Sequence, residues 1–185
     1  NGLIEQTIAL PDEVNARQVR FGFEGVTEYN GSLYVAFQRA WGSEEHPRIG
    51  VYNTTSESWS FFYYPLDDVA SQNGGWVGLS DITSLNNGKF MILERDNQGG
   101  ADAAIKRLYE FDINGIAEGS TVTKTLVRDL VNHGDLVATG GVVAEKIEGL
   151  AVMPNNDVYI VNDNDGVDDN NGETQLINLG NALLR

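Results

Sequence analysis

Three carboxylates stand at or directly after one matching place in segments of the chain that resemble one another. Glu24 and Glu148 each precede a glycine, and Asp81 takes the glycine position in the middle segment. An unpaired carboxylate that enters a buried strand would cost several kcal/mol, so each of these side chains needs a metal ion or a basic partner. Oxygen-rich clusters suit Ca²⁺. Three interpretations stay open: a metal or ligand site, a scaffold of salt bridges with Arg20, Arg39, Arg95 or Lys146, and solvated side chains.

A second acidic feature follows the apolar run Val158–Val161. The stretch after this run contains no Lys or Arg and gathers the carboxylates Asp163, Asp165, Asp168, Asp169 and Glu173. It resembles an Asp-rich calcium loop, although Val167 falls where the EF-hand pattern requires a ligand. We expect Ca²⁺ to bind here; the alternative is a solvated loop that like charges keep extended.

Basic residues stand beside these carboxylates. In "ERD" (Glu94–Asp96), Arg95 can grip a phosphate with two hydrogen bonds while Glu94 holds metal or acts as a base. The alternative is an internal Arg–carboxylate pair that orders the turn. The candidate catalytic residues are Glu24, Glu94, Arg95 and Glu148. The candidate substrate-binding residues are Arg39, Arg95 and Lys146. The candidate metal ligands are Glu24, Asp81, Glu148, Asp163, Asp165 and Asp168.

A nucleophilic triad or a zinc site finds little support. Ser80 lies in "GLSDI", which fails the G-x-S-x-G pattern at Ile82. The chain has two histidines, His46 and His133, and both lie outside the similar segments.

The elements that must position these residues are hairpins that recur along the chain. The similar segments are "FEGVTEYNGSLYVAFQR" from Phe23, "LSDITSLNNGKFMILERD" from Leu79 and "IEGLAVMPNNDVYIVNDND" from Ile147. Each has a short strand, a polar turn and a second strand. Asn30-Gly31 and Asn87-Gly88 are strong hairpin signals because both residues tolerate positive φ.

Further strands are expected after each hairpin, at Arg48–Asn53, Trp59–Tyr64, Arg107–Ile113, Val122–Leu130 and Thr174–Leu179. Repeated groups of four antiparallel strands are the signature of a β-propeller. We therefore predict an all-β partial propeller with about three four-stranded blades, whose first strands begin near Glu24, Ser80 and Glu148 and line one axis. Leu3–Leu10 is expected to be a last strand, which completes the third blade or belongs to a blade upstream.

Charge and composition narrow the function classes. The 185 residues include 12 Lys plus Arg and 27 Asp plus Glu, for a net charge of -15, and no Cys. This balance argues against nucleic acid and anionic membranes as partners. No apolar run reaches the ~20 residues that span a bilayer. We expect a single domain over residues 1–185, from a secreted or periplasmic protein.

Six motifs occur in an order that resembles the phytase-like domain family, also described as having esterase-like activity of phytase. They are "GFEGVT" (Gly22–Thr27), "YPLD" (Tyr64–Asp67), "LSDIT" (Leu79–Thr83), "ILERD" (Ile92–Asp96), "KIEGLAV" (Lys146–Val152) and "VNDND" (Val161–Asp165). The resemblance runs from about Arg20 to Leu179. It implies an Asp- and Glu-rich propeller, secreted or periplasmic, with phosphoesterase activity. Because the family domain is longer, we expect a fragment of a larger propeller.

Two functions follow as hypotheses. The first is a calcium-dependent phosphoester hydrolase that acts on a small phosphorylated substrate. The second is a non-catalytic, calcium-stabilised module for binding, adhesion or assembly with a protein partner. The short blade count also predicts self-association or packing against missing upstream blades.

Overall fold

The chain folds into three antiparallel sheets, which confirms the all-β prediction. The structure, a computed structural model, describes residues 2–18, 20–136, 143–164 and 173–182. None of the described helices is long and apolar enough to span a membrane. The elements are α1 (Asp12–Asn15), β1 (Phe23–Tyr29), β2 (Ser32–Phe37), β3 (Arg48–Asn53), β4 (Ser58–Tyr63), β5 (Val77–Asn86), β6 (Lys89–Asp96), a 3₁₀ turn (Gly100–Asp102), β7 (Lys106–Asp112), β8 (Lys124–Asp129), β9 (Ile147–Val152), β10 (Val158–Asn162) and β11 (Leu176–Asn178).

The Asn-Gly pairs form the hairpin turns that the sequence predicts. Asn30 and Gly31 have φ angles of 50° and 75°, and Asn87 and Gly88 have 54° and 77°. Positive φ at both central residues matches the right-handed twist of the strands on either side. Each of these two turns joins the first strand of a sheet to its second strand.

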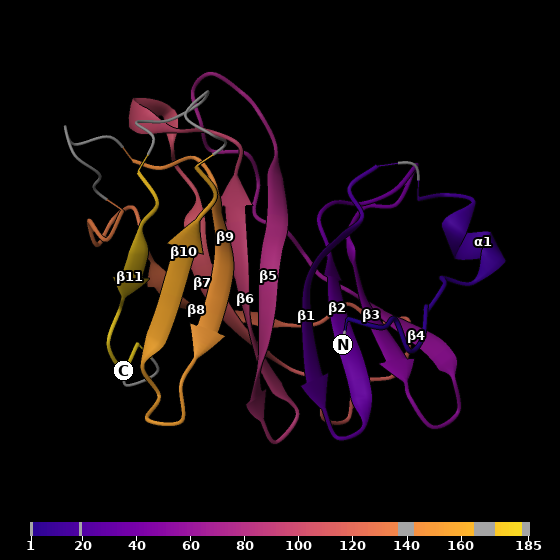
Figure 1. The fold of residues 1–185 in the computed structure, drawn as a ribbon. Helices are drawn as coiled ribbons and strands as arrows, with labels where there is room; N and C mark the ends of the chain where they lie inside the picture. The colour runs from indigo at the N-terminus through magenta and orange to yellow at the C-terminus, as the bar shows by residue number, and fades with distance from the viewer. Residues whose placement is uncertain (1, 19, 137–142, 165–172, 183–185) are drawn as a thin grey trace.

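The sheets follow the chain in order. The first sheet is β1-β2-β3-β4, the second is β5-β6-β7-β8, and the third is β11-β10-β9. The first strands β1, β5 and β9 lie side by side, and each sheet extends away from them in a different direction (Figure 1). The first two sheets have the predicted four strands and the third has three. The described strands close no ring, so the complete propeller stays a prediction.

Two apolar layers fill the spaces between the sheets. Phe90 and Ile92 of β6 face the first sheet, while Met91 and Leu93 face the third. All four side chains are fully buried. Because successive residues of a strand point to opposite faces, a continuous apolar run indicates a strand that is covered on both sides.

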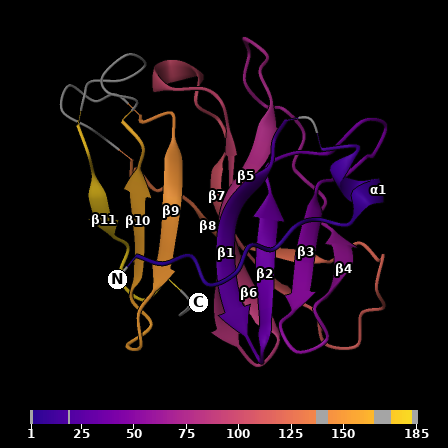
Figure 2. The ribbon, with the colours of Figure 1, turned by 45° about the vertical axis from the view of Figure 1, so that its right-hand side comes forward.

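The N-terminal segment differs from the prediction. Leu3–Leu10 forms no strand; it runs across the strands of the first sheet instead of alongside them (Figure 2). A crossing segment cannot form a ladder of backbone hydrogen bonds. The segment is held by the Trp59 indole N–H, which donates to the Ala9 carbonyl at 2.8 Å. Leu10, and Val14 from the short helix α1, pack on the same sheet.

Glycine is required where β1 passes β5. A Cβ atom at Gly25 would lie 2.3 Å from Asp81 Oδ1 and 2.5 Å from the backbone nitrogen of Ile82. No side chain fits at those distances, so the absence of a Cβ sets how closely the first two sheets approach.

We expect Gly25→Ala to lower the free energy of unfolding by about 1–3 kcal/mol, the usual cost of forcing atoms into a packed site. Denaturant unfolding followed by circular dichroism would measure the change. Thr125→Ala, on an exposed position of β8, serves as the control and should stay within about 0.5 kcal/mol. Equal stability of wild type and Gly25→Ala would contradict the role of this contact.

Candidate active site

The ends of the sheets at which β1, β5 and β9 begin bring Glu24, Arg95 and Glu148 together. Arg95 is buried, at 2% exposure. Its Nη2 atom donates to the Glu148 carboxylate, and its Nε atom donates to Ser80 Oγ at 2.9 Å. The Arg95 guanidinium therefore joins the second repeat, which contains Ser80, to the third, which contains Glu148. Arg95 and Glu148 form the internal ion pair that the sequence left open as an alternative.

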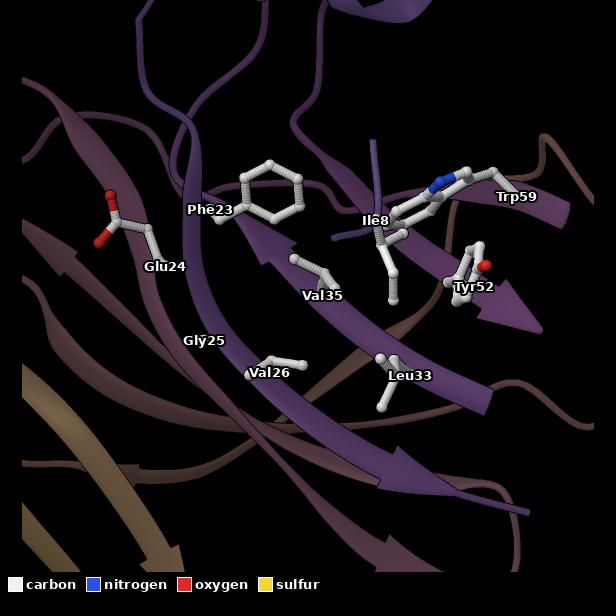
Figure 3. Close-up of a pocket in the computed structure, with 9 residues that line it drawn as sticks. All are labelled: Ile8, Phe23, Glu24, Gly25, Val26, Leu33, Val35, Tyr52 and Trp59. Carbon is white, nitrogen blue, oxygen red and sulfur yellow. The ribbon is translucent and has the colours of Figure 1, made fainter. Parts of the chain in front are cut away.

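Glu24 lies beside this pair without a basic partner of its own. Its Oε1 atom accepts a hydrogen bond of 2.8 Å from the side-chain amide of Gln38. Its carboxylate lies on the opposite side of β1 from the apolar side chains Phe23 and Val26 (Figure 3). Partial loss of hydration and the negative charge of Glu148 raise the pKa of Glu24 to about 7, against the opposing effect of Arg95. Glu24 can therefore gain or lose a proton near neutral pH.

Asp81 connects the sheets. Its Oδ2 atom accepts from the Leu150 N–H of β9 at 2.6 Å, and its Oδ1 atom accepts from the Ile82 N–H at 2.8 Å. Burial raises its pKa, although both backbone hydrogen bonds oppose the rise. Both of its oxygens are occupied by protein donors, which favours a structural role.

A row of alternating arginine and aromatic side chains lies near the same end. The Arg39 guanidinium lies 4.4 Å from the centre of the Phe21 ring and 5.0 Å from that of Trp76. Arg95 lies 5.4 Å from the Trp76 ring, and Arg20 lies 5.1 Å from the Phe21 ring. The aromatic rings hold the guanidinium groups through cation–π contacts.

Arg20 and Arg39 differ from most other basic side chains of the described residues. The structure shows no ion pair for either of them in the part of the chain that it describes. Desolvation and the neighbouring charge of Arg20 lower the pKa of Arg39. Two arginines that form no ion pair among the described residues, in a protein of net charge -15, are suited to bind an anionic group.

Glu94 lies apart from the other candidate catalytic residues. It is fully buried on the opposite face of β6 from Arg95. It accepts hydrogen bonds from the Asp67 N–H at 2.6 Å and from Lys124 Nζ at 2.7 Å. Burial raises its pKa, and Lys124 opposes the rise. The hydrogen bonds of Glu94 thus link β6 to β8 and to the segment that follows the first sheet.

Lys146 and Asp163 lie together at the end of the third sheet. The Lys146 carbonyl accepts a hydrogen bond of 2.9 Å from the Asp163 N–H, so these residues are neighbours. Asp165 and Asp168 lie outside the described residues. Among the residues that the structure describes, no three His, Cys, Asp or Glu side chains are placed to hold a metal ion. The calcium ligands therefore stay a prediction.

Sequence reasoning missed two parts of the site. The sequence motifs single out neither Arg20 nor Trp76 as a site residue, although both belong to the row of arginine and aromatic side chains. Phe21 between them has a φ angle of 60°, which is uncommon for a residue other than glycine. The only sequence signal is that Arg20 and Phe21 directly precede the first hairpin.

We expect Glu24→Gln to flatten the pH dependence of stability between about pH 4.5 and pH 7. The pKa of Glu24 rises from 4.5 to about 7 on folding, so the folded state holds the proton more tightly. This contribution to stability is complete below pH 4.5 and is lost as the pH rises through 7. Denaturant unfolding at several pH values measures it.

Glu118→Gln makes the same charge change at an exposed residue and is the matched control. It should keep the pH dependence of the wild type. An identical slope in Glu24→Gln and wild type would show that Glu24 does not titrate in this window.

The comparison with protein families finds one match. The family described as "Phytase-like: Esterase-like activity of phytase" matches residues 1–166. This match begins before Arg20 and ends before Leu179, the limits that the motifs indicate. No curated protein and no solved structure matches the chain.

Proposed function

The chain belongs to the phytase-like family, and on that basis we propose that it hydrolyses phosphate esters where β1, β5 and β9 begin. The observation that supports this proposal most is that Glu24, which has no basic partner of its own, lies at the same end of the sheets as Arg20 and Arg39, which form no ion pair among the described residues. Gln38 holds the Glu24 carboxylate and is followed in the chain by Arg39.

In the proposed reaction, Arg39 and Arg20 bind the oxygens of the phosphate group. Ionised Glu24 accepts a proton from a water molecule as the water oxygen attacks phosphorus. The bond from phosphorus to the ester oxygen breaks, and the leaving alcohol takes up a proton. A general base of this kind typically accelerates a reaction by ~10²–10⁴-fold and works best with a pKa near the working pH.

Arg95 and Glu148 act as positioning residues in this proposal. Their ion pair places a positive and a negative charge beside Glu24, and the two charges shift its pKa in opposite directions. Ser80 fixes Arg95 through the 2.9 Å hydrogen bond to its hydroxyl. The environment of Glu24 therefore depends on groups from all three sheets.

The carboxylates in this part of the site do not by themselves make a calcium centre. Glu148 pairs with Arg95, and Asp81 accepts two backbone hydrogen bonds. We propose calcium binding at the acidic stretch that begins at Asp163, where carboxylates of like charge are close in sequence. The proposal includes a secreted or periplasmic location, which cell fractionation can test.

The first test is phosphate release from para-nitrophenyl phosphate. We expect Glu24→Gln to lower kcat about 100-fold or more because it removes the base. The pH profile of kcat/KM should rise through about pH 7 in the wild type, following the pKa of Glu24. Arg39→Ala should raise KM roughly tenfold, the effect of one lost hydrogen bond to a charged group.

Glu110→Gln provides a matched control, since Glu110 pairs with Lys89 away from the site. Its activity should equal that of the wild type. If the wild type releases no phosphate from this ester or from phytate, with and without Ca²⁺, the non-catalytic binding or assembly module becomes the better hypothesis.

The second test concerns calcium. A ligand that binds only the folded state stabilises it by about 2.7 kcal/mol at a hundredfold excess over Kd, so excess Ca²⁺ should raise Tm by several degrees. A chelator should lower Tm, and Mg²⁺ should act more weakly because it demands a small octahedral shell. Asp163→Asn combined with Asp165→Asn should remove most of the calcium response.

Glu57→Gln combined with Glu118→Gln removes the same charge from exposed residues elsewhere. This control should respond to Ca²⁺ as the wild type does. If neither Ca²⁺ nor the chelator changes Tm, the acidic stretch does not bind calcium and its carboxylates are only solvated.

A further inference from the structure

A surface cavity of about 320 Å³ opens beside Arg39, which the proposed function assigns to the phosphate group. The segment that connects the first sheet to the second lines it with Asp67 and Asp68. Trp76, directly before β5, and Glu45, from the loop between β2 and β3, also line the cavity. The proposed reaction uses only Arg39 among these side chains, so the rest of the cavity can take another part of the substrate.

Asp67, the last residue of the motif "YPLD", fixes the connecting segment. Its Oδ1 atom pairs with Lys124 Nζ at 2.7 Å. Its Oδ2 atom pairs with Arg107 and accepts a hydrogen bond of 2.6 Å from the Tyr109 hydroxyl. The Asp67 N–H donates to the buried Glu94 carboxylate. Both carboxylate oxygens of Asp67 are therefore occupied, and this residue holds the cavity lining in place.

Asn97 holds the part of the lining that contains Trp76. The Trp76 N–H donates to the side-chain oxygen of Asn97 at 2.7 Å, and the Asn97 N–H donates to the Trp76 carbonyl at 3.0 Å. The Trp76 ring in turn lies 5.0 Å from the Arg39 guanidinium. Because these side chains are already positioned, a ligand pays little entropy for ordering them.

Glu45 and Asp68 differ from Asp67 because neither forms an ion pair among the described residues. Both are exposed. Two acidic side chains thus share the cavity with one unpaired basic side chain, Arg39. A positively charged group is attracted to such a lining. An alcohol with several phosphates, such as phytate, would bring further negative charge to it.

We propose that the cavity binds the alcohol part of the phosphate ester and that this alcohol carries a positively charged amine. Arg39 holds the phosphate at the rim together with Arg20, which does not line the cavity. The amine donates hydrogen bonds to Glu45 and Asp68, and the carbon chain between the two charged groups lies against Trp76. The substrate is thus zwitterionic. This inference rests on the proposed function, which assigns the phosphate to Arg39.

A matched pair of phosphonates tests the inference by isothermal titration calorimetry of the complete 185-residue chain. Aminoethylphosphonate carries the amine, and propylphosphonate has a methyl group in its place. Both have carbon bonded directly to phosphorus and are not esters, so the measurement reports binding alone. At low salt, the wild type should bind aminoethylphosphonate about fivefold more tightly, which is the scale of an ion pair that water can reach.

Glu45→Gln combined with Asp68→Asn should remove this preference, so that the variant binds the two phosphonates equally. Glu57→Gln combined with Glu118→Gln removes the same charge from exposed residues outside the cavity and should keep the preference. Arg39→Ala should weaken the binding of both phosphonates roughly tenfold, since each loses the same contact to its phosphonate group.

Equal affinity of the wild type for the two phosphonates, or binding of neither, would overturn the inference. So would a preference that persists after Glu45→Gln combined with Asp68→Asn, because the amine would then bind elsewhere. A protein that prefers aminoethylphosphonate in the expected way and releases no phosphate from any ester has the amine site without the proposed hydrolysis. The two proposals therefore fail in different experiments.

Discussion

The close contact between the first strands β1, β5 and β9 is the constraint on which the rest of the structure depends. Gly25 lets β1 approach the Asp81 side chain, and Asp81 in turn accepts the Leu150 N–H of β9. The contacts of Gly25 and Asp81 hold the first strands of the three sheets side by side. Residues far apart in the chain, such as Glu24 and Glu148, become neighbours because they begin equivalent strands.

Buried charge in this protein is arranged in pairs, with few exceptions. Lys106 and Asp96, both fully buried, form an ion pair, and burial lowers the pKa of Lys106 to about 8. Asp96 also accepts the N–H groups of Ala104 and Ile105, which satisfies its second oxygen. A buried ion pair offsets its desolvation only when such extra hydrogen bonds are present. Against this background, Glu24 and the arginines at the same end of the sheets differ, because no ion pair is formed by Glu24, Arg20 or Arg39 among the described residues.

The repeats are similar in outline and differ where they meet. Asp81 occupies the position that is glycine in the other two repeats, and its side chain uses that position to bridge two sheets. The apolar positions are shared by all three repeats, yet Val26 is exposed while its counterparts Ile82 and Leu150 are buried. The difference comes from the neighbouring sheet and not from the residue type.

The local structure follows from short stretches of sequence: the Asn-Gly turns, the alternation within the strands and the apolar run of β6 that is covered on both sides. These features depend on backbone preferences and side-chain period, which are local. Only the tertiary structure decided that Arg95 pairs with Glu148 and that Glu94, one residue earlier, faces a different cluster. The packed structure also places Leu3–Leu10 across the strands of the first sheet, where the segment forms no strand of its own. Such outcomes depend on which sheets become neighbours, and that is a property of the packed molecule that no short stretch of sequence contains.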